Sequence, residues 1–191
     1  MLRVAEALAG EMAVSTPFRE FLQQKAKTVQ AESEARKPVI EEWRNAVDRL
    51  FMQIREWLKE SDPDGLIGVE EGQKEILEPG LGDYRFPYLN LRAFGKWIGI
   101  IPKARRTVGT AKPPQQAAPT RAEGRVDMTD ELQRYVLYRF RENGHDLWMI
   151  DGLDRSYDAA ETPAMVRYVP LPNPKPLDQA AFEKALMSYL R

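Results

Sequence analysis

A chain of 191 residues with 43% hydrophobic and 30% charged residues is long enough for one well-buried core and has the composition of a globular protein. Its net charge of −1 excludes a general basic coat for nucleic acid or membranes, so an electrostatic partner has to bind a local patch. The lack of cysteine and the single histidine exclude disulfides, thiolate metal sites, a cysteine nucleophile and any site that needs two imidazoles.

The N-terminal stretch does not resemble a signal peptide, because Glu6 and Glu11 interrupt its apolar residues. No later stretch approaches the roughly 18 apolar residues of a membrane-spanning helix. We therefore expect a cytoplasmic protein, and the absence of cysteine fits a reducing compartment.

Residues 1–62 are predicted to form a helical region. Thr16 and Pro17 are a typical N-cap and first-turn pair for a helix that runs to about Gln30, and a second helix is expected to start near Pro38. In that second helix, two sets of apolar residues recur at a spacing of seven. They are Ile40, Val47 and Ile54, and Trp43, Leu50 and Trp57.

This repeat has two interpretations. The run ends after residue 58, short of the three to four heptads that indicate a coiled coil, and two tryptophans would overfill a tight two-stranded seam. We therefore favour a helix that packs on the chain's own core. The alternative is a helical partner surface formed by Trp43, Leu50 and Trp57.

Residues 63–191 are predicted to form a small antiparallel sheet of five or six strands with a C-terminal helix packed against it, which makes the chain an α+β protein. The helical region and this sheet domain either fold separately or share one continuous core. In the C-terminal helix Asp178 is the expected N-cap. The apolar face of that helix is formed by Phe182, Leu186, Tyr189 and Leu190.

The first hairpin is predicted from Phe94-Gly95-Lys96-Trp97, interpreted as a two-residue turn with glycine first, which places Leu91 opposite Ile100. This register separates an apolar face from a mixed face. The apolar face holds Leu89, Leu91, Ala93, Ile98 and Ile100, and the mixed face holds Asn90, Arg92, Phe94, Trp97 and Ile101.

The second hairpin is predicted to turn at Asn143-Gly144, the strongest short signal for a hairpin. The cross-strand pairs are Phe140 with Leu147, Tyr138 with Met149, Val136 with Asp151, Arg141 with Asp146, Arg139 with Trp148, and Leu137 with Ile150. We expect an ion pair at Arg141 and a cation–π contact at Arg139. A helix from Asp130 to Arg141 is the alternative for the first strand.

The remaining segments are predicted from their turn residues. Residues 110–124 and 152–163 are expected to be loops, and residues 164–169 a short strand. Four prolines between residues 170 and 176 indicate an extended connector to the C-terminal helix.

A local excess of positive charge is the main functional signal. Between Asp83 and Glu123 the sequence has no acidic residue. The basic residues of this window are Arg85, Arg92, Lys96, Lys103, Arg105, Arg106, Lys112 and Arg121. We expect a contact surface here, with the stretch from Lys103 to Arg106 free in solution.

The sequence therefore favours a non-catalytic protein–protein interaction or assembly subunit that uses a helical surface and a basic hairpin and loop. Its expected partner is a protein or a second copy of the chain, without a membrane, a cofactor or a small-molecule substrate. The alternative is a nucleic-acid-binding accessory protein, because basic and aromatic side chains together bind single strands. Its contact residues would be Arg92, Phe94, Lys96, Trp97, Lys103, Arg105 and Arg106.

Two further clusters give no expectation of catalysis or of a metal ion. His145 lies beside a hairpin turn, without a nucleophile or a pocket that the sequence places near it. An acidic loop lacks the fixed spacing of a calcium site. Its residues are Asp151, Asp154, Ser156, Asp158 and Glu161.

Overall fold

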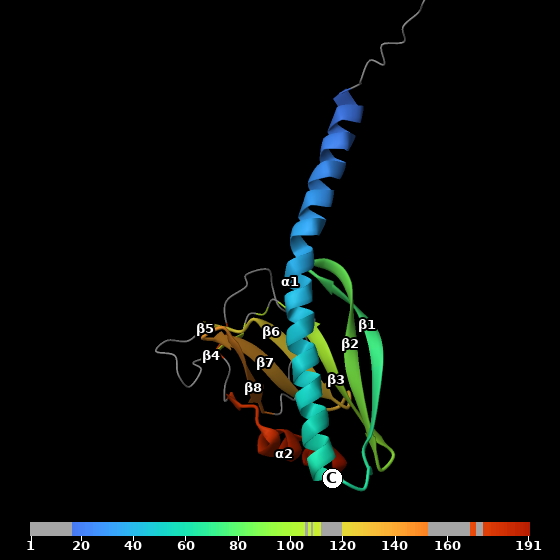
Figure 1. Cartoon of the computed structure of the whole chain (residues 1–191), viewed down its shortest axis with the longest axis vertical. Coiled ribbons are helices and arrows are strands. Elements are labelled where there is room, and N and C mark those ends of the chain that lie inside the picture. The colour runs from blue at the N-terminus through green and yellow to red at the C-terminus, as the bar shows by residue number, and fades with distance from the viewer. Residues whose placement is uncertain (1–16, 106, 108, 112–119, 153–168, 171–173) are drawn as a thin grey trace, which may run out of the picture. The chain divides into compact units, whose positions relative to one another are not determined.

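The computed structural model describes residues 17–105, 107, 109–111, 120–152, 169–170 and 174–191 (Figure 1). It confirms the α+β class, with a long N-terminal helix, an antiparallel sheet and a C-terminal helix. Two compact units divide the chain, Met1–Pro38 and Val39–Arg191. The division falls within the first helix, so the second part of that helix belongs to the same unit as the sheet.

Helix α1 runs without a break over Pro17–Ser61, where the sequence predicts two helices. The polar stretch before Pro38 continues the helix because it consists largely of good helix formers and carries ion pairs between successive turns. Arg36 pairs with Glu32 at 2.9 Å and Lys37 with Glu34 at 2.7 Å. In the first unit, the large apolar side chains of α1 are exposed. They are Phe18, Phe21, Leu22 and Val29.

The second unit is built on a seven-stranded sheet, which has more strands than the five or six predicted. Its order is β1-β2-β3-β6-β7-β8-β10, and neighbouring strands are antiparallel. The strands are β1 (Gly68–Glu78), β2 (Gly82–Ala93), β3 (Lys96–Ala104), β6 (Gly124–Thr129), β7 (Arg134–Glu142), β8 (His145–Asp151) and β10 (Lys175–Pro176).

A smaller sheet has the order β5-β4-β9. Its strands are β4 (Gly109–Ala111), β5 (Thr120–Arg121) and β9 (Val169–Pro170). Residues 110–124, predicted as a loop, therefore contain parts of three strands, β4, β5 and β6. The pairing of β4 with β9, which is distant in sequence, could not be predicted from the segment itself. The predicted loop and strand at residues 153–168 lie outside the described residues.

The register of the second hairpin is confirmed at every predicted pair, from Val136 opposite Asp151 to Arg141 opposite Asp146. The alternative helix for this segment is therefore wrong. The first hairpin is shifted by two residues, because the turn is formed by Phe94 and Gly95. Since side chains alternate between faces with a period of two, this shift leaves the predicted strand residues on their predicted faces. Phe94, predicted on a strand, lies in the turn.

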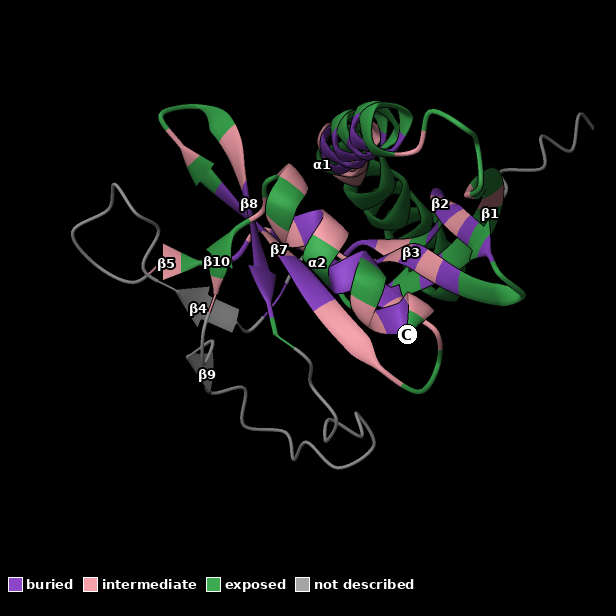
Figure 2. Ribbon diagram, turned by 90° about the horizontal axis from the view of Figure 1, so that it is seen from below, coloured by how far each residue is buried: buried purple, intermediate pink, exposed green. Residues whose placement is uncertain are grey.

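The core lies on one face of the sheet, under residues 39–61 of α1 and under α2 (Gln179–Leu190). Trp43 is fully buried, with its ring 5.8 Å from that of Phe86 and 6.0 Å from that of Trp148. Figure 2 shows buried residues on β2, β7, β8 and α2. Trp57 is also buried, against Phe182 of α2.

The partner-surface alternative for Trp43, Leu50 and Trp57 conflicts with this placement, because all three side chains are part of the core. Because of their spacing of seven, these side chains lie on one side of the helix and cover the sheet. Gly124 of β6 lies directly under Trp43, where a Cβ would come within 2.4 Å of the indole ring. Core packing therefore explains the repeat without a second chain.

The C-terminal helix α2 begins as predicted, because the Asp178 side chain accepts a hydrogen bond from the Ala181 backbone at 2.8 Å. Phe182 and Leu186 are buried against the sheet. The hydroxyl of Tyr189 donates to the Met128 carbonyl, which fastens the end of the helix to β6.

A network of charges around the buried Arg139 connects α1 to the sheet. Arg139 of β7 is only 1% exposed, and it donates to Glu42 of α1 at 3.1 Å and to Asp146 of β8 at 2.7 Å. Arg49 of α1 also donates to Asp146, at 2.5 Å. Asp146, expected to pair with Arg141, is thus held by Arg139 and Arg49.

The network lowers the pKa values of its two carboxylates, Glu42 and Asp146. The hydrogen bond from Arg139 holds the pKa of Glu42 below its ordinary value, although burial acts in the other direction. Burial also tends to raise the pKa of Asp146, but the hydrogen bonds from Arg49 and Arg139 outweigh it, and the net shift is downward. Both carboxylates are therefore ionised in the folded chain at neutral pH.

We expect acid to weaken this network. The folded-state pKa values of Glu42 and Asp146 lie below their ordinary values of 4.5 and 3.8, so the stability they contribute is present above those values. It is lost as the pH falls through the folded-state values. The free energy of unfolding, measured with urea at a series of pH values, should therefore fall below about pH 4.

Two variants isolate this effect. Glu42→Gln should cost about 1–3 kcal/mol at pH 7 and flatten the acid loss, because it removes a titrating partner of Arg139. Asp48→Asn should steepen the loss, because burial raises the pKa of Asp48 and its ionised form opposes folding. An acid loss in Glu42→Gln equal to that of the unmodified chain would contradict this role.

Candidate binding surface at the β2–β3 hairpin

The turn between β2 and β3 holds an aromatic residue in an unfavourable backbone conformation. Phe94 has a φ of 53° and Gly95 a φ of 76°, the pair of positive values that a type I′ turn needs. The second hairpin has the same pair of positive values, at Asn143 (51°) and Gly144 (81°). Asparagine tolerates positive φ, whereas a bulky residue such as phenylalanine rarely adopts it. Phe94 is therefore a backbone outlier.

Burial does not offset this strain, because the Phe94 side chain is 72% exposed. Trp97 and Leu66 are each 60% exposed and line the same shallow hollow of about 400 Å³. Arg92 lies over the Trp97 ring at 5.6 Å and pairs with Glu70 at 3.0 Å. We call Leu66, Arg92, Phe94 and Trp97 the hairpin surface.

The hairpin surface thus brings together three of the predicted contact residues, Arg92, Phe94 and Trp97, and it leaves the two aromatic ones exposed. Lys96 has a different role from the one predicted. Its ammonium donates to the Tyr189 carbonyl at 2.7 Å, at the C-terminal end of α2. A cation there satisfies a terminal carbonyl and interacts favourably with the helix dipole.

Of the residues predicted to be free in solution, Lys103 and Arg105 are instead part of the fold. Arg105 pairs with Glu42 at 3.3 Å and with Glu123 at 3.0 Å, and its backbone donates to the Glu78 carboxylate at 2.8 Å. Lys103 is half-buried, and burial lowers its pKa. Arg106 lies outside the described residues. Sequence reasoning missed these contacts because Glu42 and Glu78 are distant from Arg105 in the chain.

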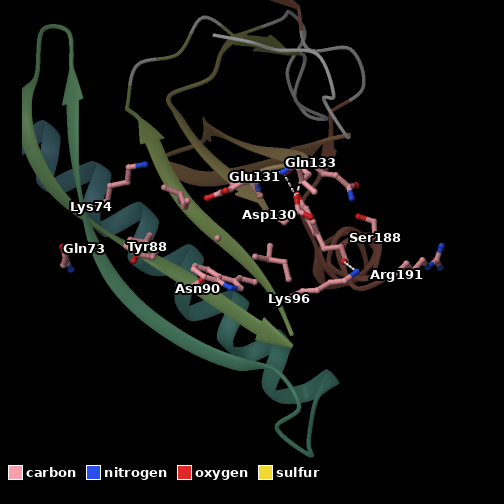
Figure 3. A pocket seen from close by; sticks show the side chains of 17 residues that line it. Gln73, Lys74, Tyr88, Asn90, Lys96, Asp130, Glu131, Gln133, Ser188 and Arg191 are labelled. Atoms are coloured by element: carbon pink, nitrogen blue, oxygen red, sulfur yellow. Dashed lines mark hydrogen bonds between the residues drawn. The ribbon is translucent and has the colours of Figure 1, made fainter. Parts of the chain in front are cut away.

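A larger pocket of about 820 Å³ adjoins the hairpin surface and shares Trp97 with it. Lys96 also lines this pocket (Figure 3). Tyr88 and Asn90 of β2 line it from one side. The turn between β6 and β7 and the end of α2 line it from the other. Sequence reasoning missed this pocket, and the only signal was Gly99 in the middle of an apolar strand.

The other sequence candidates stay apart from this surface. His145 is exposed at the tip of the second hairpin, opposite Glu142. Asp151 is buried and accepts a hydrogen bond from the Gly152 backbone at 2.9 Å. The rest of the acidic loop, from Asp154 to Glu161, lies outside the described residues.

Comparison of this chain with known protein families, with curated proteins and with solved structures finds no match. Among the helices that the structure describes, none has the length and apolar character to cross a membrane.

The backbone outlier can be tested by exchanging the two turn residues. Phe94→Asn should stabilise the chain by about 1 kcal/mol, because it relieves a positive φ at a bulky residue that buries little surface. Asn143→Phe, the matched variant, should destabilise by a similar amount. Urea denaturation measures both, and a loss of stability in Phe94→Asn would show that the Phe94 ring packs within the chain.

Proposed function

We propose that this chain is a non-catalytic interaction protein that binds a partner protein through the hairpin surface, with Phe94 as the central anchor. The observation that carries the proposal is the combination of strain and exposure at Phe94. Strained residues persist where the surrounding structure holds them, and they cluster at functional sites. At this position an exposed and strained phenylalanine should stabilise the fold less than asparagine would.

The composition of the surface supports a protein partner. Tryptophan and arginine are enriched among the residues that dominate binding energies at interfaces, and here Trp97 and Arg92 stack on each other. The hairpin fixes the Phe94 backbone before binding, so little backbone freedom is lost in a complex. Leu66 extends the apolar area beside it. The matching partner has an apolar cavity that receives the Phe94 ring.

The pairing of the basic residues favours a protein over nucleic acid. Arg92 is paired with Glu70, Lys96 with the end of α2, and Arg105 with two carboxylates. A phosphate group of a nucleic acid would have to compete with each of these contacts. Single-strand binding draws on unpaired cations as well as on aromatic rings. Nucleic acid is therefore the alternative outcome of the test, and a cytoplasmic location stays a prediction.

Partner capture with a photo-crosslinker at residue 66, a position 60% exposed within the hairpin surface, tests the proposal in lysate of the cells that produce the protein and in purified samples. Phe94→Asn should reduce the crosslinked partner at least tenfold, because central anchors contribute about 2 kcal/mol or more. Leu77→Asn is the matched control, since Leu77 is 80% exposed but lies outside the hairpin surface. It should leave capture unchanged.

Two outcomes would contradict the proposal. One is equal loss of capture in Phe94→Asn and Leu77→Asn, which would indicate a general effect of removing exposed apolar area. The other is salt-sensitive binding of a single-stranded oligonucleotide that Phe94→Asn leaves intact, with no crosslinked protein. Sedimentation of the purified chain shows whether the captured partner is a second copy.

A further inference from the structure

The pocket beside the hairpin surface owes its shape to a missing side chain. The outer face of the sheet is the face that points away from the core. On it Arg92 lies opposite Trp97, and two residues further along β2 Asn90 lies opposite Gly99. A Cβ at Gly99 would come within 2.9 Å of the Ile101 side chain, so Ile101 leans over the bare backbone. The result is a flat apolar floor between aromatic side chains.

Tyr88 forms a second wall by a similar device. It pairs with Gly72 of β1, where a Cβ would come within 2.5 Å of the Tyr88 ring. The ring therefore lies across the neighbouring strand at the side of the pocket (Figure 3). Trp97 on one side and Tyr88 on the other give the floor two aromatic boundaries.

The polar groups of the pocket are available for a ligand. Within the part of the chain that the structure describes, the Tyr88 hydroxyl and the side-chain amides of Asn90 and Gln73 have no hydrogen-bond partner. These groups offer both donors and acceptors. Charged side chains of both signs, such as Lys74 and Glu131, also line the pocket, so the site has no strong preference for an ion.

The turn between β6 and β7 forms a hydrogen-bonded rim of the pocket. Thr129 accepts a hydrogen bond from the Glu131 backbone at 3.0 Å, and Asp130 accepts one from the Gln133 backbone at 2.8 Å. Glu131 has a φ of 76°, a second strained residue that is neither glycine nor asparagine. The turn leaves Leu132 87% exposed beside the pocket.

We propose that this pocket binds an uncharged, planar heteroaromatic ligand. Its ring lies on the floor at Gly99 and Ile101 and contacts Trp97, while its polar edge exchanges hydrogen bonds with Asn90 and Tyr88. The pocket volume of about 820 Å³ falls in the usual range for small-molecule sites, which are mostly apolar with a few placed polar groups. This inference does not depend on the protein partner proposed above.

Two matched probes test the ligand class on the full chain at pH 7.5. Benzimidazole is neutral, planar and carries a donor and an acceptor, whereas naphthalene has a similar size and neither group. Nuclear magnetic resonance should show saturable shifts of the Trp97 indole N–H and the Asn90 side-chain amide with benzimidazole. Naphthalene should bind at least fivefold more weakly.

Three variants complete the test. Asn90→Leu should weaken benzimidazole at least fivefold and leave naphthalene unchanged or tighter, whereas Gly99→Val should weaken both by filling the floor. Phe94→Asn should leave the affinity for both probes unchanged, which distinguishes this site from the partner surface. The proposal is overturned if benzimidazole gives no saturable shift at Trp97 and Asn90, or if Asn90→Leu leaves its affinity unchanged.

Discussion

The buried guanidinium of Arg139 is the constraint on which the second unit depends. A charge that is 1% exposed is tolerated only when carboxylates satisfy it, and here one comes from α1 and one from β8. A shift of α1 along the sheet would separate Arg139 from Glu42 and leave the buried charge with Asp146 as its one carboxylate partner. The network thus selects one placement of residues 39–61, and in that placement Trp43 covers Gly124.

This placement gives the two faces of the β2–β3 hairpin different roles. The inner face is occupied by the core, where Leu89, Leu91 and Ile98 are fully buried. On the outer face Trp97 and, at the tip, Phe94 remain exposed. The same chain uses asparagine at the equivalent turn position of its other hairpin. The contrast between Phe94 and Asn143 indicates that the first turn gives up stability in order to present an aromatic ring.

Much of the fold could be predicted because local signals determined it. Asn143-Gly144 and the alternating pattern around it were enough for the complete register of the second hairpin. At the first hairpin the turn rules favour asparagine, aspartate or glycine at the first position, so they disfavour the Phe94-Gly95 turn that the chain adopts. A residue that breaks such a local rule without an evident gain in stability, as Phe94 does, is a candidate functional residue.

The candidate site was predicted only in part, because it combines local and distant contacts. Arg92, Phe94 and Trp97 are neighbours on one hairpin, so their association follows from strand periodicity. Two partners of Arg105, Glu42 and Glu78, come from α1 and β1, and no periodicity within one segment reveals them. The pocket likewise depends on residues from β1 to β3, a turn and α2.

Collisional quenching of tryptophan fluorescence by acrylamide tests the central claim, that the core covers one face of the hairpin and the outer face is open. The four tryptophans differ sharply in exposure, since Trp97 is 60% exposed and Trp43, Trp57 and Trp148 are at most 9% exposed. The account predicts that Trp97→Phe removes most of the quenching seen in the unmodified chain. Quenching that persists in Trp97→Phe would contradict it, because it would place a core tryptophan in contact with solvent.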